Sequence, residues 1–391
     1  MAHEIFTEAQ GMTEELVRWR RDLHQIPELG LKLPQTAAYI QERLKEMGIE
    51  STCSDSSNVV ALIGSGEPCF MLRSDMDALP VEERSGEQFS STNGCMHACG
   101  HDMHAAILLG AAKMLKVREP ELKGTVKLLF QSGEEIFSGA VAAMKEGVLE
   151  NPKVEASFAA HVFASLPFGL VAYGDKALSS AYGFHIDITG KGAHGSTPEA
   201  GVSPINAAVH IYLGLQELIA REVSGMDEVT MTVGQLHAGS AANVIPEKAW
   251  MEGTLRTFNK ETADYLIGRI TEMAVKTADA YRAKAEVTAL YNVPMVDNDP
   301  ELNEEFIESI RELDGKLVTQ KALHVMGSED FSFFTNRIPA VYMAFGAGAQ
   351  DQTRWRAQHN PEIVFNEKVL SVGAAAYVKI ATDYLTKRSK R

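Results

Sequence analysis

The sequence predicts an α/β protein with a mostly parallel sheet, into which a smaller α+β domain is inserted. Strand-like runs alternate with helical patterns in the first part of the chain, and this alternation is typical of a parallel sheet. Residues 182–293 instead follow the order strand, helix, strand, strand, helix, strand, which is typical of a ferredoxin-like α+β domain. The 391 residues also exceed the size at which one hydrophobic core stops growing. We therefore expect one domain over 1–181 and 294–391, and a second domain over 182–293.

Local signals mark the starts and ends of the expected elements. Thr13 with the acidic pair Glu14 and Glu15 predicts a helix N-terminus, and Gly48 predicts the end of the next helix. Apolar runs bounded by turn residues predict strands. We expect a helix that begins at 13 and ends before Pro27, helices over 35–47, 102–115, 137–146, 203–223, 261–282 and 367–385, and a short helix that begins at 328. We expect strands over 59–63, 70–73, 125–130, 154–161, 182–189, 229–236, 249–257, 285–291 and 339–345.

The composition is that of an acidic globular protein. Hydrophobic residues make up 45% of the chain and charged residues 23%. The net charge of −15 repels phosphate backbones and anionic lipids, so we expect no nucleic-acid and no membrane partner. Residues 1–20 lack the apolar core of a signal peptide, and no apolar run is long enough to span a bilayer. The four cysteines show no paired framework, which predicts a cytoplasmic location, with Cys53 and Cys69 as small buried residues.

The densest group of chemically active side chains lies between Gly94 and His104. These residues include two cysteines, three histidines and one aspartate. Thiolate, imidazole and carboxylate are the groups that bind borderline transition metals. Cys99 and His101 flank Gly100, and residues two apart do not share a helix face, so the pair fits a tight turn at the start of the following helix. The sequence therefore predicts a metal site where this loop enters a helix.

Further side chains of the same kind follow three of the expected strands. The carboxyl ends of parallel strands meet at one edge of a sheet, where α/β proteins place their sites. Two unpaired carboxylates after an apolar strand would be costly, so we expect them to bind metal or to orient metal-binding histidines. Where two glutamates are adjacent, they point in different directions, so one can bind metal while the other holds a proton. The three groups are Asp75 with Asp77, Glu134 with Glu135, and His161.

Taken in order, these motifs resemble the dinuclear-metal amidohydrolases that include N-acyl-amino-acid amidohydrolase (aminoacylase), hippurate hydrolase and the plant indole-acetyl-amino-acid hydrolases. The resemblance covers nearly the whole chain, and the ordered set is far more specific than any one motif. It implies a metallopeptidase-like catalytic domain with an inserted lid and dimerisation domain. The matching segments are Asp75 to Pro80, Met96 to Asp102, Gln131 to Glu135, the strand carrying His161, Gly192 to His194, Asn243 to Pro246, Ser328 to Phe331 and His359 to Pro361.

The resemblance implies a site for two divalent metal ions, with Glu134 as the general base. The ions would be Mn²⁺ or Zn²⁺, and thiolate and imidazole ligands also tolerate Co²⁺ and Ni²⁺. Related peptidases carry His-x-Asp at the position of Asp75 and Asp77, and an Asp at the position of Cys99. Whether Asp75 or Asp77 contacts a metal therefore stays open. The implied metal ligands are Cys99, His101, Glu135, His161 and His359.

The implied reaction is hydrolysis of the amide bond of a small N-acyl-amino acid. His194 and Asn243 of the insert are the expected contacts to the developing oxyanion. Arg256 is expected either to bind a substrate carboxylate or to form an ordinary ion pair between strands. Asp75, Asp77 and Asp102 are expected to lie behind the metal ligands and orient them. The resemblance also implies a homodimer or a dimer-based oligomer, in which the histidine of the insert reaches the neighbouring site.

Three alternatives stay open from the residues alone. A dipeptidase or aminopeptidase on the same scaffold would need a group that recognises a free α-amine, and the sequence shows no clear one. A non-catalytic metal-binding protein would have no reason to keep Glu134 beside a full ligand set. A thiol enzyme would use Cys99 as nucleophile and His101 as base, and alkylation rather than chelation would stop it. The sequence names neither the acyl group nor the amino acid of the substrate.

Overall fold

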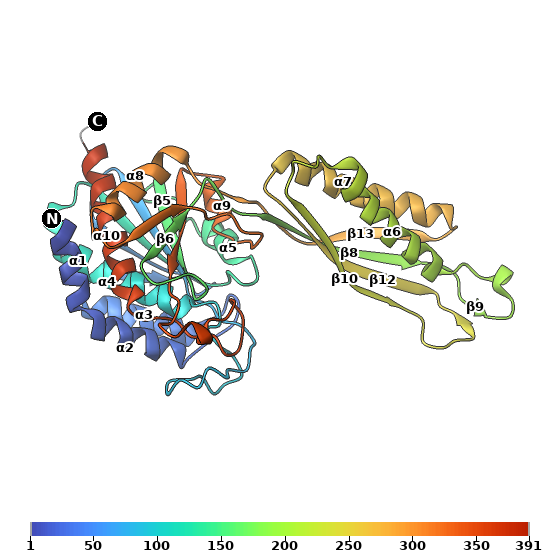
Figure 1. Ribbon diagram of the computed structural model, residues 1–391, viewed down its shortest axis with the longest axis horizontal. Coiled ribbons are helices and arrows are strands. Elements are labelled where there is room, and N and C mark those ends of the chain that lie inside the picture. Colours follow the sequence, from blue (N-terminus) through green and yellow to red (C-terminus); the bar gives the residue numbers. More distant parts are fainter. Residues whose placement is uncertain (1, 390–391) are drawn as a thin grey trace. The chain divides into compact units, whose positions relative to one another are not determined.

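The structure is a computed structural model that describes residues 2–389. The chain divides into two compact units, which are both visible in Figure 1. The first unit comprises Met1–Ala177, Val296–His324 and Glu329–Arg391. The second comprises Leu178–Met295 and Val325–Ser328. The second unit therefore interrupts the first in sequence.

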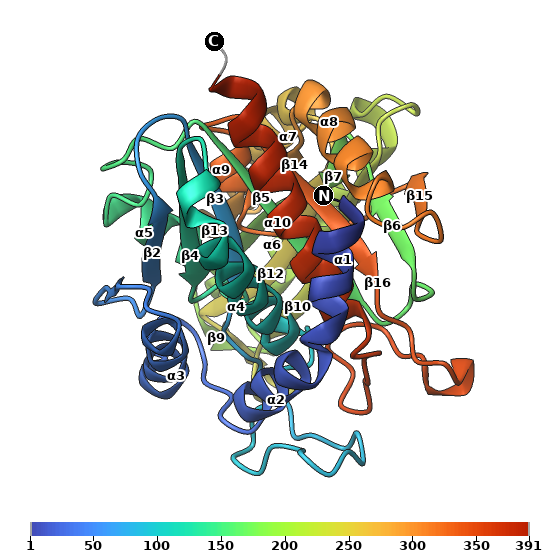
Figure 2. The same cartoon turned by 90° about the vertical axis from the view of Figure 1, so that its left-hand side faces the viewer.

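An eight-stranded sheet forms the centre of the first unit (Figure 2). Its order is β1-β2-β4-β3-β5-β16-β6-β15, and the four strands β4, β3, β5 and β16 run parallel. The strands are β1 Ser51–Cys53, β2 Val59–Gly64, β3 Cys69–Asp75, β4 Thr125–Gln131, β5 Ala156–Phe163, β6 Leu170–Tyr173, β15 Val318–Lys321 and β16 Ala340–Gly346. A separate ribbon pairs β7 (Lys176–Leu178) with β14 (Val296–Asp297).

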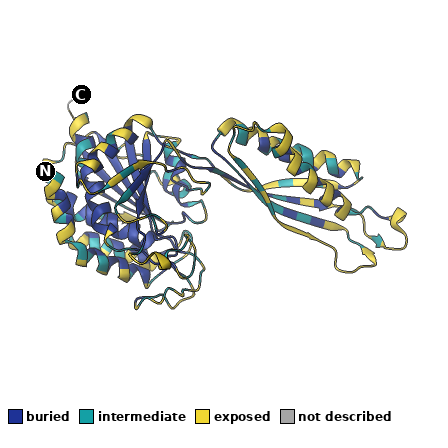
Figure 3. Cartoon of the chain, viewed as in Figure 1, coloured by how far each residue is buried: buried dark blue, intermediate teal, exposed yellow. Residues whose placement is uncertain are grey.

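The four parallel strands are buried almost throughout, as Figure 3 shows. Strands covered on both faces need continuous apolar sequence rather than alternation, and β3, β4, β5 and β16 have it. Because the strands are parallel, their carboxyl ends lie along one edge of the sheet. Polar side chains at that edge come from strands and loops that are far apart in the chain.

Helices pack around this sheet, and α4 and α10 contact each other and β3. Figure 2 shows both of them in front of the sheet. Both are alanine-rich and almost wholly buried, which allows close packing. None of the helices in residues 2–389 combines the length and the apolar character that a bilayer crossing requires. The helices are α1 Ala2–Gly11, α2 Thr13–His24, α3 Pro34–Glu46, α4 His101–Val117, α5 Gly139–Lys145, α8 Pro300–Arg311, α9 Ser332–Thr335 and α10 Val369–Arg388, with short 3₁₀ turns η1 Glu119–Glu121 and η3 Gln352–Arg354.

The second unit is a four-stranded antiparallel sheet with two long helices. The strand order is β10-β12-β8-β13, which is the ferredoxin-like order for a chain running β8, α6, β10, β12, α7, β13. Buried side chains of α6 and α7 form one apolar core with the sheet. The elements are β8 Ser180–Thr189, β9 Ala193–His194, η2 Pro198–Ala200, α6 Pro204–Glu222, β10 Val229–Ala238, β11 Val244–Ile245, β12 Lys248–Thr257, α7 Lys260–Ala280 and β13 Lys284–Val293. Strands β9 and β11 form a separate ribbon.

The structure confirms the expected α/β class and the ferredoxin-like order of the insert. It adds elements that the sequence patterns did not predict, among them the helices α1 and α8 and the short strands β1, β6 and β15. Cys69 is buried as expected, but the expectation for Cys53 was wrong. Cys53 ends the edge strand β1 and is exposed, because an edge strand has a neighbour on only one side.

Gly100 joins the loop that carries Cys99 to α4, and its conformation requires glycine. Its φ is +96°, and an added Cβ would lie 2.8 Å from Val162 Cγ2 and 3.0 Å from Phe365 Cζ. We predict that Gly100→Ala lowers the free energy of unfolding by about 1–2 kcal/mol for the backbone and about 1–3 kcal/mol more for the contacts. Gly66→Ala is the matched control, since its φ is +83° with nothing within 4 Å. Both variants would be unfolded in urea, and equal losses in their free energy of unfolding would contradict this account.

Candidate active site

The five implied metal ligands come together in the first unit. They form two groups of three residues. Within each group the donor atoms lie within 4.8 Å of one another, and Cys99 belongs to both groups. Cys99 Sγ lies 3.3 Å from Nε2 of His161, and Nε2 of His359 lies 3.5 Å from a carboxylate oxygen of Glu135. The two groups are Cys99 with His101 and His161, and Cys99 with Glu135 and His359.

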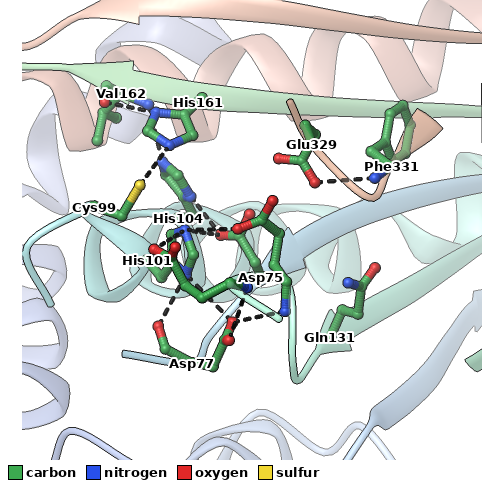
Figure 4. A network of polar contacts seen from close by, with 12 residues as sticks. Asp75, Asp77, Cys99, His101, His104, Gln131, His161, Val162, Glu329 and Phe331 are labelled. Atoms are coloured by element: carbon green, nitrogen blue, oxygen red, sulfur yellow. Dashed lines mark hydrogen bonds and ion pairs between the residues drawn. The ribbon is translucent and has the colours of Figure 1, made fainter. Parts of the chain in front are cut away.

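Each of two buried histidines is fixed by a carbonyl oxygen (Figure 4). Nδ1 of His101 lies 2.9 Å from the carbonyl oxygen of Asp77, and Nδ1 of His161 lies 2.8 Å from that of Val162. A carbonyl oxygen only accepts, so each Nδ1 carries the proton and each neutral ring keeps a lone pair on Nε2. In the neutral form of each ring, Nε2 is therefore the atom that can act as a ligand; that of His161 faces Cys99 Sγ.

The donor set fits a cation. Nε2 of His101 and Oε1 of Glu135 are buried, and within the described residues neither atom has a hydrogen-bond partner. Buried polar groups are normally satisfied, so these two unpartnered atoms, which lie 3.8 Å from each other, point to a ligand that both could bind. One thiol, three imidazoles and one carboxylate are the donors that zinc and similar divalent ions accept. These residues would hold such ions, and Nδ1–H···O=C bonds of the kind just described commonly fix metal-binding histidines.

Asp75 and Asp77 each bind other protein groups, and Asp75 also forms a further candidate metal group with His101 and His104. The two carboxylate oxygens of Asp77 accept from the backbone N–H groups of Glu134 and Glu135, each at 3.1 Å. Asp75 accepts from Nη1 of Arg73 at 2.7 Å, and its other oxygen lies 2.5 Å from Nδ1 of His104. Asp77 thereby holds the turn that carries both glutamates, and it also fixes the His101 ring through its carbonyl oxygen.

Asp102 connects the start of α4 to α2. Its Oδ2 lies 2.7 Å from Nε of Arg20 and 2.8 Å from Nδ1 of His24. Burial opposes ionisation of Asp102, but Arg20 and His24 lower its pKa below the usual range. Asp102 follows His101 directly, so this ion pair fixes the first turn of α4 rather than contacting the ligand atoms.

The sequence patterns missed a buried network centred on Arg73. This arginine is almost fully buried in β3 and binds Asp75, Glu329 and Asp330 at 2.7–2.9 Å. Its Nε donates to Gln131 at 3.1 Å. The available signal was an arginine inside an otherwise apolar strand, since a buried guanidinium requires carboxylate partners.

Glu134 faces two further carboxylates. A carboxylate oxygen of Glu134 lies within 4.8 Å of oxygens of Glu329 and Asp330. Burial raises the pKa of Glu134 well above its usual range, and the negative charges of Glu329 and Glu135 act in the same direction. Burial also raises the pKa of Glu135 to about 7 and that of Asp330 to about 8. The site is therefore strongly acidic and favours added positive charge.

The second unit carries the three residues implied for substrate contact. His194 and Asn243 are close together, because Gly195 N–H donates to the Asn243 carbonyl oxygen at 2.7 Å. The exposed His194 accepts through Nδ1 from the hydroxyl of Ser196 at 2.7 Å. Nη1 of Arg256 donates to the carbonyl oxygen of Met326 and the hydroxyl of Ser328, each at 3.0 Å. The roles of His194, Asn243 and Arg256 toward a substrate stay predictions.

A comparison of the whole chain with known proteins decides its family. The sequence profile of peptidase family M20/M25/M40 matches residues 71–383. The chain belongs to this family.

Curated relatives and solved structures match this chain over most of their lengths. IAA-amino acid hydrolase ILR1-like 2 of Arabidopsis thaliana is 39% identical, over 99% of this chain and 89% of that protein. An N-acetylcysteine deacetylase of Bacillus subtilis is 35% identical, over 95% of this chain and 97% of that protein. The crystal structure of the YXEP protein of Bacillus subtilis, described as a dinuclear metal binding peptidase of the M20 family, superposes with a TM-score of 0.82. It is 32% identical, over 96% of this chain and 99% of that one.

Proposed function

We propose that this M20 protein hydrolyses the amide bond of N-acyl-amino acids with the help of two divalent metal ions. The observation that carries the proposal is the pair of ligand groups that share Cys99, with Glu134 beside them outside both groups. The similarity to an IAA-amino acid hydrolase and to an N-acetylcysteine deacetylase supports the substrate class. Both of those names describe the removal of an acyl group from the nitrogen of an amino acid.

The two ligand groups suggest how the ions would be shared. One ion would be held by Cys99, His101 and His161, and the other by Cys99, Glu135 and His359. We favour Zn²⁺ or Mn²⁺, and the same donors tolerate Co²⁺ and Ni²⁺. The thiol of Cys99 must stay reduced to bind a metal ion, which fits a cytoplasmic protein with four free cysteines.

Bound divalent ions would supply Lewis acid chemistry, polarising the amide carbonyl and lowering the pKa of water at the site. Glu134 would take a proton from the attacking water on a carboxylate oxygen and return it to the leaving nitrogen. Asp77 fixes the backbone of Glu134 through the hydrogen bond at 3.1 Å, so the carboxylate starts from a defined position. The carboxylates of Glu329 and Asp330, which both bind Arg73, lie close to the carboxylate of Glu134.

The direct test is amino-acid release from a panel of N-acetyl, N-benzoyl and indole-acetyl amino acids, with dipeptides included. We expect chelated protein to be inactive and added Mn²⁺ or Zn²⁺ to restore release. Release from dipeptides alone would favour the peptidase alternative. Activity that survives chelation but is lost on alkylation would contradict the proposal and favour a thiol enzyme.

Glu134→Gln tests the general base. We expect turnover to fall by about 10²–10⁴-fold, because the amide cannot carry the proton. Metal content should stay unchanged, since Glu134 belongs to neither of the two groups that share Cys99; loss of metal would instead indicate that Glu134 binds an ion together with His101 and Glu135. Glu121→Gln, on the exposed turn η1, is the control for loss of one negative charge. Wild-type turnover in Glu134→Gln would rule out this role.

We also propose that the second unit forms a homodimer interface. Strand β10 is an edge of its sheet, and a free edge is a template for pairing with another chain. The helix α6, which packs against β10, exposes an apolar stripe. A self-complementary strip of this kind fits a two-fold symmetric dimer. The stripe consists of Ile205, Val209, Tyr212 and Leu213, which are 38–54% exposed.

The dimer proposal predicts a change of molar mass on charging this stripe. Leu213→Glu should convert a dimer into a monomer in light scattering, because a carboxylate would be buried without a partner. Val275→Glu is the control, since Val275 is an exposed apolar residue on the other helix, α7. A wild-type protein that sediments as a monomer at micromolar concentration would refute the proposal.

A further inference from the structure

Gln358 lies in the loop before α10 and binds the backbone of two other segments. Its Nε2 donates to the carbonyl oxygen of Cys99 at 2.9 Å and to that of Val162 at 3.0 Å. Its Oε1 accepts from the backbone N–H of Ala164 at 3.4 Å. Because carbonyl oxygens only accept, the NH₂ group must face Cys99 and Val162, and this fixes the orientation of the amide.

The residues that Gln358 contacts belong to segments carrying proposed metal ligands. Cys99 is the ligand common to both groups. Val162 follows His161, and its carbonyl oxygen also accepts from Nδ1 of His161 at 2.8 Å. Gln358 itself precedes His359. One side chain thereby connects three of the five ligands, which lie far apart in the sequence.

His359 is the ligand that most needs support. Its φ is +69°, in the left-handed region that residues with a Cβ avoid, and such strain persists only where surrounding contacts fix it. Its side chain is 52% exposed, whereas that of His101 is 1% exposed. The contacts that fix its backbone are its own N–H, which donates to the carbonyl oxygen of Ala98 at 3.0 Å, and the neighbouring amide of Gln358.

We propose that Gln358 is a positioning residue of the metal centre. It holds the loop of His359, the turn of Cys99 and the end of β5 at the spacing that two ions require. It does not touch the reacting atoms, and it acts through the backbone of the ligand segments. The inference rests on the proposed dinuclear site, and it adds a residue outside the ligand set that determines how tightly that site binds.

The test measures zinc affinity directly, without an activity assay. Zn²⁺ binding to the full chain is followed by competition with a chromophoric chelator, for wild type and the variants Gln358→Ala and Gln358→Glu. The glutamate keeps the size of the side chain but directs a carboxylate at two carbonyl oxygens. We expect both variants to bind the weaker of the two ions about 10–100-fold less tightly. We also expect Co²⁺-loaded variants to lose intensity in the cysteine-to-cobalt absorption band.

Controls separate positioning from a general loss of fold. Gln352→Ala changes an exposed glutamine of the same loop region and should keep wild-type affinity. Thermal unfolding of the metal-free proteins by circular dichroism verifies that the Gln358 variants are folded at the temperature of the titration. Folded Gln358 variants with wild-type zinc affinity would overturn the inference. A wild-type chain that binds no zinc would instead overturn the proposed function, so the two failures are distinguishable.

Discussion

Six carboxylates are concentrated at one edge of the central sheet, and the need to balance their charge determines much of the structure. Arg73 provides part of that balance through ion pairs with three of them. An uncompensated buried charge is costly, so the remaining carboxylates need either protons or cations. Two divalent ions at the neighbouring donor groups would provide the positive charge that the protein side chains do not supply. The six are Asp75, Asp77, Glu134, Glu135, Glu329 and Asp330.

The parallel sheet explains how this concentration arises. Strands β3 and β4 end beside each other at Asp75 and Gln131, so the motifs that follow them meet without long connections. The turn after β3 then does two tasks, because Asp77 holds the His101 ring through its carbonyl oxygen and the glutamate turn through its carboxylate. The guanidinium of Arg73, which is also on β3, binds groups from β4 and from the segment before α9. Protein donors thus hold several of these carboxylates, and the two donor groups that share Cys99 include one of them, Glu135.

Part of the candidate ligand set was predictable from local patterns in the sequence, whereas the full set with His359 came from the resemblance to the dinuclear-metal amidohydrolases. Two cysteines and three histidines within eleven residues, and acidic pairs directly after apolar strands, are visible without any knowledge of the fold. The ferredoxin-like order of the insert is visible for the same reason, since each of its elements is long. Short elements such as β6 and β15 were missed because four residues carry too little pattern to identify a strand.

The supporting residues could not be found because their partners are distant in sequence. Arg73 pairs with Glu329 and Asp330 more than 250 residues away, and Gln358 binds the carbonyl of Cys99 from 259 residues away. A glutamine in a loop has no periodicity and no characteristic spacing that indicates such a contact. Only the three-dimensional arrangement shows that the amide faces two backbone carbonyls.

The most direct measurement is a crystal structure of the zinc-loaded protein with diffraction data collected on both sides of the zinc absorption edge. The account predicts two anomalous peaks per chain, one on each side of Cys99 Sγ, with His161 at one ion and His359 at the other. Arg73 should keep its three carboxylate partners in that structure. No zinc peak at these residues, or a single ion that leaves the Cys99 sulfur without a metal, would contradict the shared-cysteine site from which the proposed chemistry follows.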